Sequence, residues 1–181
     1  MGGCADYIRC GGHIQKSPAT EEGSTDRELP EVTPIPIVHD SNDFDPLQVN
    51  QVKPLFNGDE ATFVDRDDAV SELSPIVDYL LEHPDYTVIL AGTTATAGTN
   101  EQCKELSLRR AEAVRQLMID MGTSETQIKH VIGLGYDHEF HVEDLNADGS
   151  LNEKNAPENR AVLVIGTSTE AAQILEKYYI E

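Results

Sequence analysis

Arg110 and the turn at residues 92–98 are the parts of the sequence best suited to bind a charged ligand. The turn reads Gly-Thr-Thr-Ala-Thr-Ala-Gly and follows an apolar segment, which places it at the end of a predicted β-strand. Arg110 lies in the next predicted element, a helix, so the turn and the guanidinium can converge at one edge of a sheet. A guanidinium suits a carboxylate because its planar fork donates two parallel, charge-assisted hydrogen bonds. The alternative is that Arg110 pairs with an acid at the sheet edge or donates to backbone carbonyl groups.

Three sequence landmarks surround this arginine in a fixed order. They are the turn at 92–98, the pairs Leu106-Ser107 and Arg110-Ala111 on one predicted helix, and Asn159-Arg160 before a late apolar strand. Together they resemble the OmpA-like peptidoglycan-binding domain. That family has a Gly-His-Thr-Asp turn, a helix containing Leu-Ser-x-x-Arg-Ala, and a last strand that carries Asn-Arg-Arg-Val. The resemblance covers about residues 52–165 and implies a non-enzymatic module that binds the stem peptide of peptidoglycan.

The resemblance also implies roles for individual residues. In the family, the aspartate of the turn pairs with the ammonium group of diaminopimelate, and the arginine of the Arg-Ala pair holds its carboxylate. Arg110 keeps the arginine. Four other positions differ from the family pattern: Thr93 stands for histidine, Ala95 for aspartate, Cys103 for asparagine and Ala161 for arginine. Removing the carboxylate partner of a buried ammonium typically costs about 2–5 kcal/mol of binding energy.

Other polar groups can still line the groove that the resemblance implies. Threonine hydroxyls and backbone N–H groups of the turn can bind an anionic group. Asn57 or Asp59, at the other mouth of the groove, can replace the missing charge, although turn formation alone explains both. The candidate ligand-binding residues are Asn57, Asp59, Thr93, Thr94, Ala95, Cys103 and Arg110. The alternative function is a structural or protein-interaction component that uses the same groove for another protein.

Residues 144–152 carry a second pattern, which resembles the first nine residues of an EF-hand or dockerin calcium loop. The candidate calcium ligands are Asp144, Asn146, Asp148 and Asn152. Calcium requires such clustered oxygen atoms, and Gly149 permits the sharp turn between them. The twelfth position is Asn155 rather than a bidentate acid, and an ordinary surface turn is the favoured alternative. Calcium is therefore the one cofactor that the sequence suggests, and the family resemblance requires none.

Three histidines, His130, His138 and His141, raise the question of a transition-metal site. The spacing of His138 and His141 does not by itself supply a third ligand of suitable geometry, so surface histidines are the favoured interpretation. The sequence contains no Gly-x-Ser-x-Gly, phosphate-binding loop or dinucleotide fingerprint. An enzyme is therefore not predicted.

The chain is strongly acidic, with 33 Asp and Glu against 13 Lys and Arg and a net charge of −20. This charge repels nucleic-acid phosphates and anionic lipids, which excludes nucleic acid as an expected partner. No apolar run is long enough for a transmembrane segment. The first twenty residues lack a secretory signal, although Gly3-Cys4-Ala5-Asp6 resembles a lipoprotein cleavage site without its apolar leader. By family resemblance alone, the expected location is the cell envelope.

Residues 1–50 are rich in Pro and Gly and lack apolar periodicity, which predicts an extended acidic arm. Pro34–Val38 suits an edge strand or an extended ligand because proline is confined to such places. The arm can dock on the domain or on a neighbouring subunit. Its Cys4 and Cys10, together with Cys103, form no disulfide framework.

Residues 51–181 are predicted to form the OmpA-like domain, which ends in a C-terminal helix. Apolar patterning predicts strands at Val52–Phe56, Tyr86–Ala91, Val131–Gly135 and Ala161–Ile165. It predicts helices at Ala69–Leu81, from the end of the 92–99 loop to about Met121 with Leu106–Met118 packed on the sheet, and from Thr167 or Ser168 to Tyr178. Asp65 or Asp67 is expected to cap the first helix, and His83-Pro84 to end it. Alternating strands and helices predict an α/β (α+β sandwich) fold of βαβαβ type, with helices packed on one face of the sheet.

Overall fold

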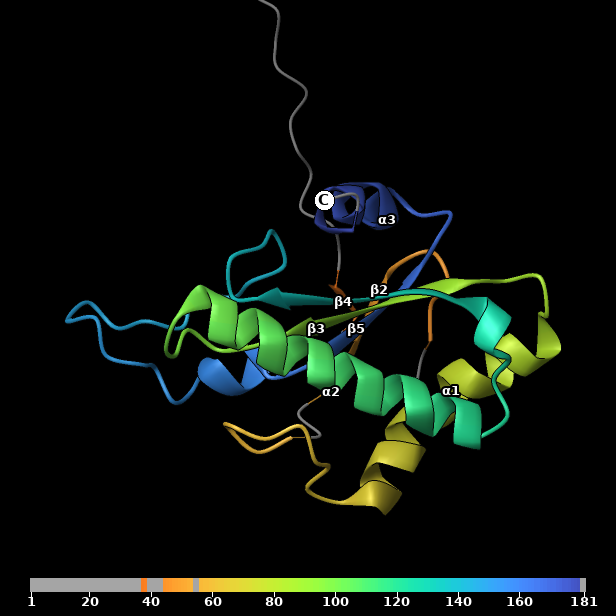
Figure 1. The fold of residues 1–181 in the computed structure, drawn as a ribbon, viewed down its shortest axis with the longest axis horizontal. Coiled ribbons are helices and arrows are strands. Elements are labelled where there is room, and N and C mark those ends of the chain that lie inside the picture. Colours follow the sequence, from red (N-terminus) through yellow and green to blue (C-terminus); the bar gives the residue numbers. More distant parts are fainter. Residues whose placement is uncertain (1–36, 39–43, 54–55, 180–181) are drawn as a thin grey trace, which may run out of the picture. The chain divides into compact units, whose positions relative to one another are not determined.

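The computed structural model describes residues 37–38, 44–53 and 56–179. Cys4, Cys10 and most of the predicted arm lie outside the described residues. The sheet has the strand order β1-β2-β5-β3-β4, and these strands are β1 (Ile37–Val38), β2 (Val49–Val52), β3 (Val88–Thr93), β4 (Ile128–Gly135) and β5 (Val162–Gly166). Figure 1 shows this sheet between helices. The predicted α/β fold is confirmed.

The sheet is mixed, and its most buried strand lies at its centre. β5 runs antiparallel to both β2 and β3, whereas β3 pairs with β4 in parallel. All residues of β5 are buried, as expected for a continuous apolar strand that is covered on both faces. β3 ends at Thr93, two residues later than the predicted strand end at Ala91, so Gly92 and Thr93 belong to the strand and the turn itself begins at Thr94.

The helix α1 (Arg66–Glu82) begins and ends where the sequence predicts. Asp65 is its N-cap, and the carboxylate accepts hydrogen bonds from the backbone N–H groups of Asp67 and Asp68. His83 follows as the C-cap, directly before Pro84. The buried face of α1 consists of Ala69, Leu73, Ile76, Val77 and Leu80.

The helix α2 (Asn100–Asp120) begins directly after the 92–99 loop and ends close to Met121, as the sequence predicts. Thr99 and Gln102 form a reciprocal capping box that fixes its start. α2 lies very close to the sheet: a Cβ atom at Gly92 would come within 1.9 Å of the carbonyl oxygen of Ser107. Glycine at position 92 therefore permits a close approach of strand and helix, which brings the 92–98 turn next to Arg110.

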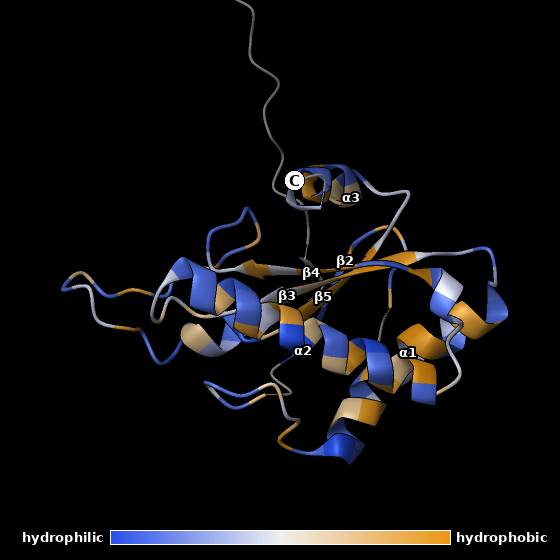
Figure 2. Cartoon of the chain, viewed as in Figure 1, coloured by the Kyte–Doolittle hydropathy of each residue, from blue (hydrophilic) through white to orange (hydrophobic). Residues whose placement is uncertain are grey.

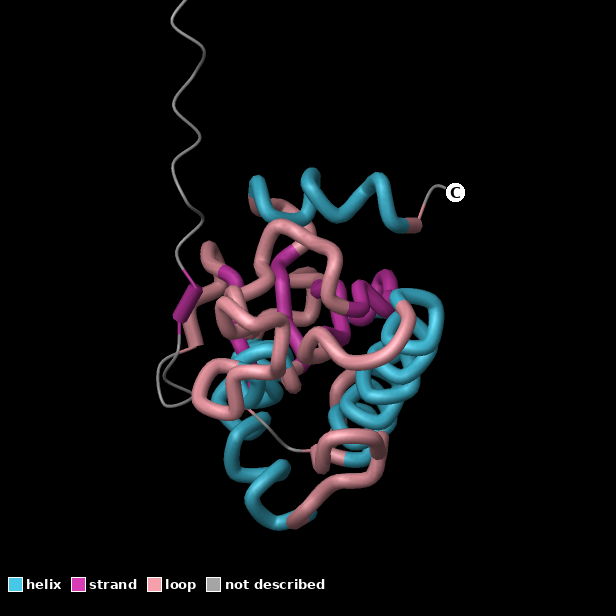
Figure 3. Tube along the Cα trace, turned by 90° about the vertical axis from the view of Figure 1, so that its left-hand side faces the viewer, coloured by secondary structure: helices cyan, strands magenta, loops and turns pink. Residues whose placement is uncertain are grey.

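The helices cover both faces of the sheet. α1 and α2 share one apolar core with residues such as Leu90 and Val164, whereas the short helix α3 (Glu170–Leu175) packs on the opposite face against Ile89 and Ile165. Figure 3 shows the strands between these two layers, and Figure 2 shows hydrophobic residues on the strands and polar ones on the outer loops. The sequence predicted α1 and α2 on one face and did not place α3 on the other.

The beginning of the domain differs from the sequence prediction. β2 occupies Val49–Val52 rather than Val52–Phe56, so the predicted boundary at residue 50 falls inside a strand. Ile37–Val38 forms a parallel edge strand on β2, as the proline pattern indicated. Phe56 instead makes an isolated bridge with Phe63, which closes a loop before α1. No helix in the described ranges is long and apolar enough to cross a membrane.

Candidate ligand-binding groove

Arg110 is fully buried, although the sequence nominated it as a ligand-binding residue. Its Nε donates to the carbonyl oxygen of Glu60 at 2.9 Å. Its Nη2 donates to the carbonyl oxygens of Asn57 and Gly58, both at 2.7 Å. The guanidinium therefore holds the 57–60 turn through three backbone acceptors. This is the carbonyl-binding alternative that the sequence left open.

The loop that Arg110 holds is closed by aromatic contacts. The rings of Phe56 and Phe63 stack with centroids 5.1 Å apart, and the guanidinium carbon of Arg110 lies 5.5 Å from the Phe56 ring centroid. Burial and the neighbouring Arg160 lower the pKa of Arg110 to about 10, so the side chain stays charged at neutral pH. Its Nη1 is buried and has no hydrogen-bond partner among the described residues. The guanidinium that the family resemblance assigns to a ligand carboxylate is thus covered by the loop at residues 56–63.

The predicted residues of the 92–98 turn are also buried. Thr93, Thr94 and Ala95 are at most 5% exposed. The hydroxyl of Thr93 donates to the carbonyl oxygen of Asn159 at 2.7 Å, and the backbone N–H of Thr94 donates to the carbonyl oxygen of Gly135 at 2.8 Å. These groups fix the turn to neighbouring segments and do not line its outer surface.

A buried carboxylate from a distant segment reaches this turn. Asp144 is fully buried and accepts hydrogen bonds from the backbone N–H of Thr96 and the side-chain amide of Asn159, each at 2.9 Å. His141 lies beside it, with Nε2 3.3 Å from Oδ1 of Asp144. Burial raises the pKa of the Asp144 carboxyl, but hydrogen bonds from Thr96 and Asn159 outweigh burial and hold the pKa below its ordinary value. Asp144 therefore stabilises the turn from its buried side. It does so at Thr96, the residue that follows Ala95, where the family has its aspartate.

A groove of about 370 Å³ lies outside the turn, between the 57–60 turn and α2. Its lining includes Asp59, the Ala97–Gly98 segment, Cys103, Leu106 and Arg109. The thiol of Cys103 lies 2.8 Å from the carbonyl oxygen of Ala97, which ties the turn to the helix. Of the residues predicted to bind ligand, Asp59 and Cys103 line this groove.

Arg109 is the groove residue that the sequence interpretation missed. Its guanidinium pairs with Glu105 at 2.7 Å, and both side chains are more than half exposed. An exposed pair of this kind contributes only about 0.3–0.5 kcal/mol, so Arg109 can exchange its partner for a ligand carboxylate. Helical periodicity in the sequence indicates its position: Leu106 and Arg109 are three residues apart and therefore share the helix face that flanks the groove.

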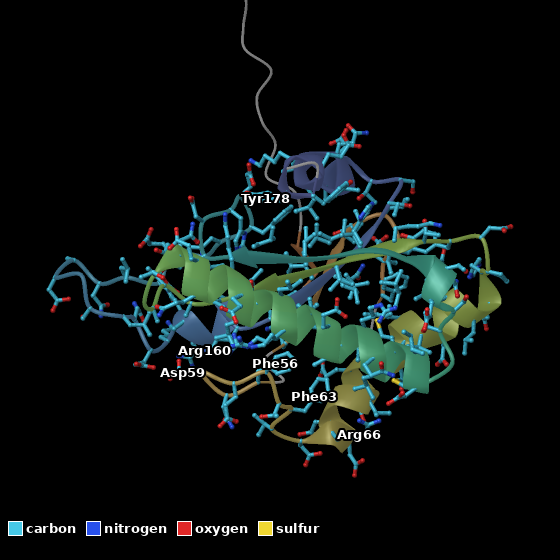
Figure 4. All side chains as sticks on the ribbon, in the orientation of Figure 1. Phe56, Asp59, Phe63, Arg66, Arg160 and Tyr178 are labelled. Carbon is cyan, nitrogen blue, oxygen red and sulfur yellow. The ribbon has the colours of Figure 1, made fainter. Side chains whose placement is uncertain are left out.

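The groove exposes two acidic side chains, Asp59 and Glu105, and one basic side chain, Arg109, which pairs with Glu105. Asp59 can accept hydrogen bonds from an ammonium group, and Arg109 can donate to a carboxylate. In Figure 4, Asp59 lies at the same end of the molecule as Arg160, on the loop that continues through Phe63 to Arg66. A zwitterionic ligand therefore matches the charges exposed here.

The side chains of all four predicted calcium ligands take part in hydrogen bonds with other protein groups. Asp144 bonds to Thr96 and Asn159, as described above. The carboxylate of Asp148 accepts from the backbone and hydroxyl of Ser150, and the side chain of Asn152 accepts from the backbone N–H groups of Lys154 and Asn155. The side-chain amide of Asn146 donates to Ser150 and Leu151. These bonds account for the sequence pattern as a turn, and calcium binding stays a prediction.

The three histidines do not share one environment. His130 is exposed and stacks on Tyr179, with ring centroids 4.0 Å apart. His138 and His141 are partly buried, which corrects the prediction that they are surface residues. Burial and the neighbouring His141 lower the pKa of His138 to about 4, so its ring is neutral at pH 7. Within the part of the chain that the structure describes, no cluster of three or more His, Cys, Asp or Glu side chains could hold a metal ion.

Comparison with known proteins identifies the family to which this fold and groove belong. The model of the OmpA family matches residues 55–153, which is more than half of the chain. The chain belongs to the OmpA family. No curated protein matches the sequence.

Solved OmpA-like structures resemble the chain at low sequence identity. The peptidoglycan-associated lipoprotein from Burkholderia pseudomallei is 25% identical, with a TM-score of 0.49, over 64% of this chain and 88% of that protein. The OmpA-like domain of FopA1 from Francisella tularensis is 23% identical, with a TM-score of 0.46, over 64% of this chain and 69% of that one. The periplasmic domain of Helicobacter pylori MotB is 18% identical, with a TM-score of 0.50, over 77% of this chain and 90% of that domain. The MotB likeness supports the fold.

Membership of the OmpA family sharpens the meaning of the buried residues. The family arginine is present as Arg110, but its hydrogen-bonding groups face the 57–60 turn. The family aspartate is absent, because Ala95 occupies its position and is itself buried. The charges that remain at the surface of the groove are those of Asp59 and Arg109, with Glu105 beside them.

Proposed function

We propose that this chain is a non-enzymatic peptidoglycan-binding module that takes the stem peptide in the groove between the 57–60 turn and α2. The observation that carries the proposal is the pair of opposite charges, Asp59 and Arg109, in a groove beside the 92–98 turn of an OmpA-family domain. Asp59 would accept from the ammonium group of diaminopimelate, and Arg109 would hold its carboxylate. Cys103 would lie between them on the groove wall.

The geometry supports Asp59 rather than Ala95 as the acid. Asp59 is exposed, and its backbone is positioned by the Arg110 hydrogen bonds to the neighbouring Asn57, Gly58 and Glu60. A turn held in this way needs little ordering when a ligand binds, which favours affinity. Arg110 therefore acts through the turn, as a positioning residue.

Arg109 is the better candidate for the carboxylate because its guanidinium reaches the surface. A charge-assisted hydrogen bond to a ligand is worth about 1.5–3 kcal/mol, which exceeds the small contribution of the exposed pair with Glu105. Exchange of Glu105 for the ligand is therefore favourable. The same exchange is closed to Arg110, since its guanidinium is buried and already donates to the 57–60 turn.

We extend the proposal to the location and the cofactor requirement of the domain. Binding to peptidoglycan places the domain in the cell envelope, and it requires no cofactor; calcium at residues 144–152 would add stability rather than ligand contacts. We extend the proposal to the residues before the sheet, which would serve as an extended acidic arm that contacts the domain or a neighbouring subunit.

Sedimentation with purified peptidoglycan tests the function. The wild-type chain should pellet with the cell wall, and a soluble diaminopimelate-containing stem peptide should compete. Glu153→Gln removes one exposed acid that does not line the groove and serves as the charge-matched control for Asp59→Asn. Arg115→Gln removes one cation outside the groove lining and serves as the control for Arg109→Gln. Absence of the wild-type protein from the pellet at low salt would reject the proposal.

The burial of Arg110 favours a second candidate function. A domain whose family arginine is covered and whose family aspartate is an alanine can serve as a structural or protein-interaction component. In that case the groove would bind a polypeptide, and neither peptidoglycan nor the free stem peptide would bind. The sedimentation experiment separates the two functions.

A further inference from the structure

A second cleft, of about 440 Å³, lies at the corner where α1 ends and β3 begins. It is lined by Tyr79, Glu82, His83, Pro84, Asp85 and Tyr86. α1 has 17 residues, and at a rise of about 1.5 Å per residue its two ends lie roughly 25 Å apart. The corner is at the C-terminal end of α1, whereas the 57–60 turn precedes its N-terminal end. The cleft is therefore separate from the proposed peptidoglycan groove.

The walls of this cleft are aromatic and well supported. Tyr79 meets Tyr86 edge to face, with centroids 5.2 Å apart, and stacks on His83 at 4.0 Å. Phe44 packs against Tyr79, with ring centroids 4.9 Å apart. The hydroxyl of Tyr86 donates to the carbonyl oxygen of Pro46, which fixes its ring. Tyr79 and Tyr86 remain half-buried, so part of each side chain is accessible.

The rim of the cleft carries negative charge that the described residues do not neutralise. Residues 67–103 contain seven Asp and Glu and no Lys or Arg. Glu82 and Asp85 are exposed at the cleft, and neither pairs with a Lys or Arg in the described ranges. On the neighbouring helix, by contrast, Asp120 pairs with Arg66 at 3.0 Å. Exposed carboxylates that no Lys or Arg of the described ranges pairs with favour a cationic partner through electrostatic complementarity.

We propose that this corner is a docking site for a basic segment of a partner protein. Arginine suits the cleft because its guanidinium can lie against an aromatic ring and donate to a carboxylate at the same time. Tyr79 and Tyr86 supply the aromatic surface, and Glu82 and Asp85 supply the acceptors. Apolar side chains of the same segment would contact the exposed parts of the rings. The site would operate whether or not the distant groove binds peptidoglycan.

An NMR titration of the full chain tests this site with acetyl-(Arg-Leu)3-amide as the probe and acetyl-(Glu-Leu)3-amide as its acidic counterpart. The arginine peptide should shift the amide signals of residues 79–86, and the acidic peptide should not. The double variant Glu82→Gln/Asp85→Asn should weaken binding of the arginine peptide at least tenfold. The charge-matched variant Glu153→Gln/Glu176→Gln should change it by less than twofold.

The two double variants distinguish specific docking from attraction to the overall charge of −20, because both remove two acids. Equal weakening in the two double variants, shifts confined to other surfaces, or no shift at millimolar arginine peptide and low salt would each overturn the proposal. Tyr79→Leu keeps an apolar side chain against Phe44 and removes the aromatic wall. This variant, once its spectrum shows an intact fold, should weaken binding of the arginine peptide several-fold. An unchanged affinity would overturn the role of the aromatic cleft.

Discussion

Arg109 and Arg110 are neighbours in the sequence, yet they have opposite environments. Arg110 is fully buried and donates to three backbone carbonyls. The side chain of Arg109, by contrast, is more than half exposed, and its guanidinium pairs with Glu105. Consecutive residues on a helix point about 100° apart, so one faces the 57–60 turn and the other the surface. Arg110 therefore serves the stability of the loop, and under the proposed function the ligand contact passes to its neighbour Arg109.

The two arginines should differ strongly in their contribution to the free energy of unfolding. Arg110→Ala should lower the free energy of unfolding by about 3–5 kcal/mol, because a fully buried side chain is removed, three backbone carbonyl groups lose their donor and the loop loses its support. Arg109→Ala should lower it by less than about 0.5 kcal/mol. Urea denaturation of both variants measures the difference. Equal losses would contradict the division between a structural and a surface arginine.

The buried carboxylate beneath the turn should have the next largest effect. Asp144→Ala leaves the backbone N–H of Thr96 without its partner and removes one of the two acceptors of the Asn159 amide, which should cost about 3 kcal/mol of unfolding free energy. Because the folded-state pKa of Asp144 is depressed, its contribution is present above the ordinary carboxyl pKa and is lost as pH falls through the folded-state value. Denaturation at pH 7 and pH 3 should show a smaller difference between wild type and variant at pH 3. A constant difference would show that the ionised carboxylate is not what stabilises the turn.

A partly buried histidine should give a smaller dependence on pH. The unfolded chain takes up a proton at His138 near pH 6.5, whereas the folded chain does so only near pH 4. Unfolding therefore becomes easier as pH falls through this window, by on the order of 2 kcal/mol after allowance for partial exposure. His138→Gln should reduce this slope. Identical slopes in wild type and His138→Gln would contradict the assigned protonation.

Most of the fold could be predicted because its helices and central strands are apolar and periodic. α1 and β5 follow directly from spacing and from continuous hydrophobicity. β2 was misplaced because Asn50 and Gln51 are polar and nevertheless buried in the strand. Their side-chain amides donate to the carbonyl oxygens of Asp45 and Glu158, and these partners cannot be recognised from the strand's own sequence.

The site was predicted less completely, because its character depends on contacts between distant segments. The sequence placed Arg110 next to the turn, and it raised carbonyl binding as an alternative, but it could not show that residues 57–60 cover the guanidinium. Asp144 was assigned to a calcium loop, since its 48-residue separation from Thr96 conceals their hydrogen bond. Arg109 was overlooked because the family motif draws attention to the next residue.

A smaller effect, on binding and not on stability, is expected from the central proposal, which assigns the ligand contacts of the family aspartate and arginine to Asp59 and Arg109. Titration of a diaminopimelate-containing stem peptide into wild type, Asp59→Asn and Arg109→Gln tests it most directly. Each variant should keep wild-type stability and bind about tenfold more weakly, equivalent to about 1.4 kcal/mol. Wild-type binding with unchanged affinity in both folded variants would contradict the account, because the ligand would then be held without the two charges that the groove exposes.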